Sequence, residues 1–167
     1  MKKSVIMAIL VLSLLACQTT EVVSDFTGNE STYYLQKASD YPVTGIVTFK
    51  EKTDGSTKII VVLSGTEGNY FHPVHLHLGD ISVDGADVAA LLTPVFGKTG
   101  ISETDITKLA DETSISYRDL LELEASLKIH LSDQGIERDI ILAGGNIGKL
   151  AVSNSAGRTG FGLCKSN

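Results

Sequence analysis

Two stretches separated by a short polar turn decide the fold of this chain: Thr44-Gly-Ile-Val-Thr-Phe-Lys-Glu51 and Lys58-Ile-Ile-Val-Val-Leu-Ser64. Both are rich in β-branched and aromatic residues, which favour β-strands. Between them stands Asp54-Gly55, a dipeptide typical of tight hairpin turns. The sequence therefore predicts a β-hairpin over residues 44–64.

Further short elements are predicted on the C-terminal side of this hairpin. Residues 80–112 are interrupted by glycine and proline and predict a long loop region with short strand or helical pieces. Ser116 with Asp119 three residues later fits a helix N-cap, which predicts a short helix from 116 to about 124. Many short strands with glycine and aspartate turns predict an all-β domain, either an antiparallel sandwich or a Greek-key β-barrel. The remaining strands are expected at 73–78, 125–132 and 139–143, with a last one at either 149–152 or 160–163.

The four histidines of the chain are the candidate functional residues, and three of them lie close together in His72-Pro-Val-His-Leu-His77. Side chains two apart in a strand share a face, so His75 and His77 point away from Val74, Leu76 and Leu78, which we expect in the core. By the same alternation His130 points away from Leu127, Ile129 and Leu131. If the two strands are neighbours, three imidazoles converge on one patch outside the hydrophobic core.

Three imidazoles suit a copper or zinc ion and leave one coordination position open. Histidines on the solvent face of a strand also occur without a metal, and the pattern alone leaves both interpretations open. His72, which precedes Pro73 at the start of its strand, fits a hydrogen-bonding residue better than a ligand.

These motifs resemble those of a known family. The stretch from His72 to Asp80 is similar to H-x-F-H-x-H-x-x-G-D of the copper/zinc superoxide dismutases, with one residue fewer before Gly79. A closer resemblance is to bacterial CHRD-domain proteins of the same superfamily. It implies an eight-stranded Greek-key barrel over residues 42–167. The corresponding motifs here are Thr44-Gly45, 72–77, 117–121, 129–132 and 145–148. The resemblance to the dismutases implies that His75, His77 and His130 stand at copper-ligand positions and that Arg158 stands at the position of the active-site arginine.

The sequence also departs from the dismutase pattern. Leu91-Leu-Thr-Pro94 stands where the bridging histidine belongs, and no histidine remains for a zinc site. Phe161 stands where the second cysteine of the family disulfide belongs. We therefore expect a non-catalytic module that holds copper or zinc. One alternative is a zinc-free copper superoxide dismutase that uses Arg158. The other is a structural cell-surface module without metal. Outside a dismutase, Arg158 is expected to be an ordinary solvated arginine.

The N-terminus has the features of a secretory signal, with Lys2 and Lys3 before a short apolar run. Leu14-Leu15-Ala16-Cys17 resembles the lipobox of bacterial lipoproteins, and the alternative is an ordinary signal with a chance cysteine. We expect a signal peptide at 1–16, lipid on Cys17 and a tether over 17–41. The protein would then be exported and anchored to a membrane, and Gln18 resembles the outer-membrane sorting pattern.

Charge and cysteine content agree with an exported domain. Removal of residues 1–16 takes Lys2 and Lys3 from the 14 basic residues and none of the 20 acidic ones, which leaves a formal charge of −8. Such an acidic chain argues against nucleic acid as a partner. With Cys17 lipidated, Cys164 is the second and last cysteine, so no intramolecular disulfide is expected.

The lipobox interpretation predicts that Cys17→Ala abolishes lipid attachment. In a bacterial host fed labelled palmitate, the wild-type chain should be labelled and sediment with membranes, because acyl chains add about 0.8 kcal/mol of membrane affinity per buried methylene. Cys164→Ala is the matched control and should retain both properties. Equal labelling of Cys17→Ala and the wild type would contradict the prediction.

Overall fold

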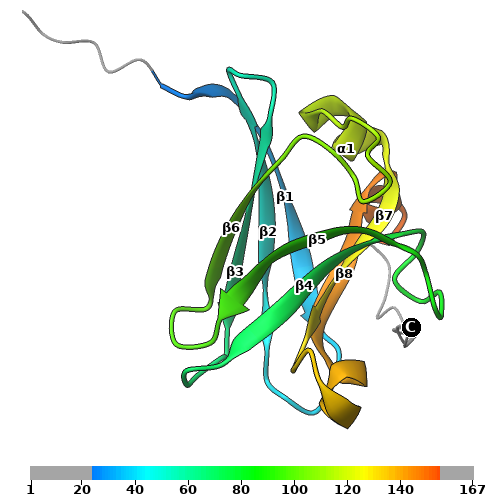
Figure 1. Cartoon of the computed structure of the whole chain (residues 1–167). Helices are drawn as coiled ribbons and strands as arrows, with labels where there is room; N and C mark the ends of the chain where they lie inside the picture. Colours follow the sequence, from blue (N-terminus) through cyan, green and yellow to red (C-terminus); the bar gives the residue numbers. More distant parts are fainter. Residues whose placement is uncertain (1–23, 155–167) are drawn as a thin grey trace, which may run out of the picture.

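Strands form most of residues 24–154, the part of the chain that the computed structural model describes. Within this range the elements follow one another in an almost all-β order (Figure 1). They are β1 (Phe26–Lys37), β2 (Thr44–Lys52), β3 (Thr57–Ser64), β4 (Phe71–Leu78), β5 (Val88–Phe96), β6 (Ile101–Ile106), α1 (Tyr117–Glu122), β7 (Glu124–His130), the 3₁₀ turn η1 (Gly135–Asp139), β8 (Ile141–Gly148) and the 3₁₀ turn η2 (Lys149–Asn154).

The strands close into an antiparallel barrel in the order β1-β2-β3-β6-β5-β4-β7-β8. Strands β4, β5 and β6 follow one another as neighbours, and β7 then returns to lie beside β4, which is the Greek-key arrangement. The predicted hairpin is β2 and β3, paired from Thr44↔Ser64 to Glu51↔Thr57. The predicted Greek-key β-barrel is therefore confirmed.

The hydrophobic core fills the inside of the barrel with alternate residues of each strand. Phe49 of β2 and Ile59 of β3 are almost fully buried, as are Leu76 of β4 and Leu127 of β7. Tyr33 of β1 packs edge-on against Phe49, with ring centroids 5.4 Å apart. The sequence pattern predicts that alternate residues of these strands face the core, and in the barrel they do.

Closure of the barrel depends on a glycine in β8. Strand β1 meets β8 through Gln36↔Gly144 and Lys37↔Ala143. A Cβ atom on the adjacent Gly145 would lie 2.3 Å from the carbonyl oxygen of Tyr34, so any side chain there would push β1 away. Only glycine allows this close backbone approach.

Two predictions about element positions are wrong. The tether expected over 17–41 is, from Phe26 to Lys37, barrel strand β1, which pairs with β2 along most of its length. Its polar residues face outward on an exposed strand, so the segment lacks the sustained apolar pattern from which a strand is predicted. The loop region expected over 80–112 contains the full strands β5 and β6, because their glycines and prolines lie at strand ends or on exposed positions.

The predicted short helix is confirmed as α1. Ser116 Oγ accepts from the backbone N–H of Asp119, whose carboxylate accepts from the N–H of Ser116, so both halves of the capping box are present. Of the two alternatives for a last strand, 149–152 belongs to η2, and 160–163 lies outside the described residues. None of the helices in the described range is long and apolar enough to cross a membrane.

The place of β1 in the barrel predicts that Leu35→Ala destabilises the protein. Leu35 is 2% exposed, and truncating a buried leucine costs about 2–5 kcal/mol in the free energy of unfolding. Its neighbour Tyr34 is 80% exposed, so Tyr34→Ala should change stability by no more than about 0.5 kcal/mol. Urea unfolding of both variants measures the difference, and similar small effects would mean that this segment is only a tether.

Candidate metal centre

The three predicted ligand residues come from two neighbouring strands. Strand β4 carries His75 and His77, and β7 ends at His130. The strands pair with His75 opposite Lys128 and His77 opposite Ser126, so His130 lies diagonally across from His75. The ring centroids of His75 and His130 are 4.6 Å apart, and those of His75 and His77 are 5.8 Å apart. The predicted convergence of the three imidazoles is confirmed.

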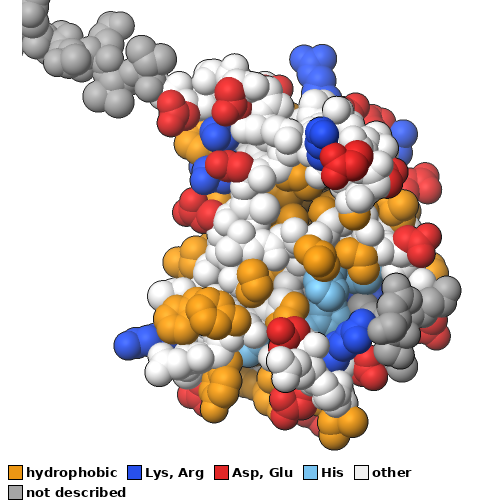
Figure 2. Space-filling view, in the orientation of Figure 1, with side chains coloured by type: hydrophobic (Ala, Val, Ile, Leu, Met, Phe, Trp, Pro, Cys, Tyr) orange, Lys and Arg blue, Asp and Glu red, His pale blue; other side chains and the backbone are white. Residues whose placement is uncertain are grey.

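The surroundings of the histidines differ from the solvent-exposed strand face that alternation alone predicts. His77 and His130 are each 1% exposed, and His75 is partly exposed. Two connecting segments account for the burial: residues 79–87 after β4 contact His77, and residues 131–140 after β7 contact His130. Histidine side chains are visible on one face of the molecule, next to hydrophobic side chains (Figure 2).

Backbone carbonyls fix the orientation of two rings. His77 donates from Nδ1 to the carbonyl oxygen of Ala86 at 2.9 Å, and His130 donates from Nδ1 to that of Arg138 at 2.7 Å. A carbonyl oxygen can only accept, so in the neutral rings the proton sits on Nδ1 and the lone pair on Nε2. Metal-binding histidines use the same arrangement, in which one ring nitrogen donates to a carbonyl or carboxylate oxygen and the other binds the metal.

His75 differs from the other two because its Nδ1 has no partner. The atom is buried and makes no hydrogen bond to any described residue. A buried polar atom without a partner costs about 1–3 kcal/mol, so it calls for a compensating interaction. A metal ion bound between the three rings would provide that interaction.

The spacing of the nitrogen atoms fits one small ion. One ligand atom from each of His75, His77 and His130 lies within 4.8 Å of the other two. Zinc–nitrogen bonds of about 2.0–2.1 Å in a tetrahedral site place the nitrogens roughly 3.4 Å apart, so the rings need to close by at most about 1.4 Å. Small side-chain rotations suffice for this movement. Within the described residues this is the one group of three such side chains that could hold an ion.

The electrostatic environment keeps the rings neutral, which ligation requires. Burial, together with the nearby His130, His77 and Arg138, lowers the pKa of His75 from 6.5 to about 4. Burial also lowers the pKa of His77 and of His130, although their hydrogen bonds to Ala86 and Arg138 oppose the effect. All three rings can therefore offer a lone pair at neutral pH.

The other residues singled out in the sequence lie apart from the cluster or outside the described part of the chain. His72 donates from Nδ1 to the carbonyl of Leu131 at 3.0 Å and stands apart from the cluster, as predicted for a hydrogen-bonding residue. Leu78, expected in the core, is exposed at the end of β4. Cys17 and Arg158 lie outside the described residues, so lipidation and an arginine role stay predictions.

Sequence analysis missed the residues that support the cluster. The carbonyls of Ala86 and Arg138 leave no signal in residue type, because any amino acid supplies a backbone oxygen. Lys128 is fully buried opposite His75, whereas alternation placed it on a solvent face. Only the course of the two connecting segments reveals these contacts.

Comparison with known proteins adds no assignment. No protein-family model matches the chain, and no curated protein or solved structure is significantly similar to it. The three-histidine group is therefore interpreted from its own geometry.

The lowered histidine pKa values predict acid sensitivity of the metal-free protein. Between pH 6.5 and about 4 the unfolded chain protonates a histidine at position 75 but the folded chain does not, so the free energy of unfolding should fall as the pH falls through this range. Urea unfolding after chelation measures it. His75→Gln removes this titration and should make the dependence on pH shallower. Identical pH dependence in the two proteins would contradict the assignment.

Proposed function

We propose that this chain is a metal-binding module that holds one copper or zinc ion through His75, His77 and His130. The observation that carries the proposal is the convergence of three mostly buried imidazoles, one of which has a buried Nδ1 atom without a partner. The ion would bind Nε2 of His77 and of His130, whose Nδ1 atoms are engaged, and Nδ1 of His75. Imidazole is a good ligand for both metals, so the donor set does not discriminate between them.

We propose further that the bound ion does not turn over a substrate. Leu91, at the position that the dismutase resemblance gives to a bridging histidine, pairs directly with His75 on β5 and is 71% exposed. An isobutyl group cannot bridge two metals or relay a proton. A single ion whose neighbouring strand offers a leucine in place of a bridging histidine suits metal storage or transfer better than redox cycling.

The proposed setting is the outside of the cytoplasmic membrane. The lipobox-like sequence around Cys17 supports a lipid-anchored, exported protein, and the ordered motifs from Thr44 to Gly148 support a CHRD-like domain of the superoxide dismutase-like superfamily. The strand order of the barrel agrees with the Greek-key fold that this resemblance implies.

The proposal predicts one equivalent of tightly bound copper or zinc per chain. The full-length chain, purified in a non-ionic detergent and stripped with chelator, should bind the metal alone in a calorimetric titration. His75→Ala, His77→Ala and His130→Ala should each weaken binding by at least the roughly 10–100-fold that loss of an outer-shell partner costs. His72→Gln, which keeps an N–H donor for the Leu131 carbonyl, is the matched control and should bind normally.

Two results would separate the alternatives. If His75→Ala and His130→Ala bind copper and zinc as the wild type does, the metal site is absent and a structural module remains. If the copper-loaded protein consumes superoxide and Arg158→Ala does not, the protein is a copper superoxide dismutase and the non-catalytic proposal is wrong.

A further inference from the structure

Two adjoining hollows are lined largely by residues at the beginning of β4 and after β7, segments that lie at the end of the barrel farthest from the beginning of β1 (Figure 1). Their volumes are about 640 and 360 Å³, which lie within the roughly 300–1,000 Å³ of small-molecule sites. They share Tyr41, Tyr70, His72 and Leu131 and form one continuous concave surface. The residues of the metal centre do not line them.

Aromatic side chains form much of the wall. Tyr41 and Tyr70 line both hollows, Phe71 lines the larger one, and all three are exposed. Exposed aromatic faces attract cations through the ring quadrupole and also cover apolar parts of a ligand.

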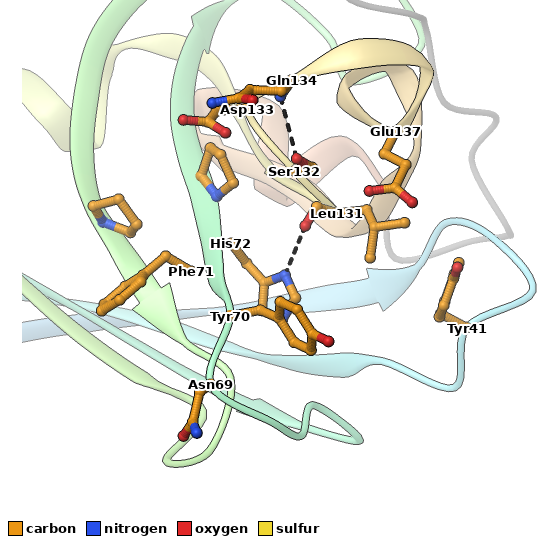
Figure 3. A pocket seen from close by; sticks show the side chains of 12 residues that line it. Tyr41, Asn69, Tyr70, Phe71, His72, Leu131, Ser132, Asp133, Gln134 and Glu137 are labelled. Carbon is orange, nitrogen blue, oxygen red and sulfur yellow. Dashed lines mark hydrogen bonds between the residues drawn. The ribbon is translucent and has the colours of Figure 1, made fainter.

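His72 supplies a buried acceptor between the two hollows. The residue is only 5% exposed, and its Nδ1 donates to the carbonyl oxygen of Leu131 (Figure 3). The proton of the neutral ring is therefore on Nδ1, and Nε2 can only accept. Nε2 makes no hydrogen bond to any described residue. A ligand with an N–H group would satisfy this atom.

The charges around the hollows have one sign. Asp133 and Glu137 line the larger hollow and Glu67 the smaller, and among the described residues no lysine or arginine lines either of them. None of the three carboxylates forms an ion pair with a described residue. Figure 3 shows Glu137 above Tyr41. The field in the hollow therefore favours a positive ligand.

A bare metal ion does not fit this arrangement. Among the described residues, His75, His77 and His130 are the one group of three such side chains that could share an ion, and neither His72 nor these carboxylates belong to it. An organic cation is larger. It can place a charged N–H group near a carboxylate and His72 while its carbon atoms cover the tyrosine rings.

We propose that these hollows are a second binding site, which takes a small organic cation of the primary alkylammonium class. The ammonium group donates a hydrogen bond to Nε2 of His72, the carboxylates that line the hollows attract its charge, and the alkyl chain packs against Tyr41 and Tyr70. This site is independent of the proposed metal function, because no metal ligand takes part in it.

The test uses the full-length chain in a non-ionic detergent and butylammonium chloride as the probe, followed by amide resonances in nuclear magnetic resonance titrations. Resonances of residues 69–73 and 131–137 should shift together and saturate. Butan-1-ol, which has the same chain without the charge, should bind at least about tenfold more weakly, as expected when a charged hydrogen bond and a cation–aromatic contact are lost.

Glu137→Gln changes an exposed side chain and keeps its shape, so the fold should be unaffected. The variant should bind butylammonium about three- to tenfold more weakly than the wild type. Glu30→Gln removes the same charge from β1, where Glu30 pairs with Lys50, and should bind as the wild type does. Equal binding of butan-1-ol and butylammonium, saturable binding of glucose instead, or absence of shifts at these residues would each overturn the proposal. Loss of metal binding in the His75→Ala variant would leave it intact.

Discussion

The antiparallel pairing of β4 with β7 is the constraint on which both the core and the histidine group depend. Its register places Val74 opposite Ile129 and Leu76 opposite Leu127 inside the barrel. The same register places His75 and His77 beside the strand that ends at His130. Because successive side chains of a strand point to opposite faces, a shift of one residue would send the histidines into the core and the aliphatic residues outward. The energy of burying the core therefore also holds the three imidazoles together.

The outer face of this strand pair is not an ordinary solvent face. The connections after β4 and β7 fold back over it and turn the carbonyls of Ala86 and Arg138 toward His77 and His130. These hydrogen bonds offset the cost of burying two imidazoles and select the tautomer that leaves Nε2 available. His75 lacks such a partner, so two of the three imidazoles have a hydrogen bond at Nδ1 and the third has none. That asymmetry is why a bound ion explains the cluster better than a purely structural histidine network does.

One segment, residues 131–140, connects the two proposed sites. Its Leu131 carbonyl orients His72, its Arg138 carbonyl orients His130, and its Glu137 lines the larger hollow. Glu137 and Arg138 are neighbours in η1, and each contributes to a different site. The residues of the candidate metal centre do not line the hollows, so the two sites are distinct although they share this support.

The sequence by itself determined the all-β class, the hairpin of β2 and β3, the capped helix α1 and the three residues of the metal centre. Each of these follows from local periodicity or from a short motif, which act within a few residues. Only the tertiary structure decided that residues 26–37 are a barrel strand, that His77 and His130 are buried, and which carbonyls orient them. Strand β1 is polar on its outer face and gains its stability from β2 and β8, which no local pattern reports. Burial of Lys128 and of the imidazoles likewise depends on connections that arrive from far along the chain, and residue type does not encode their path.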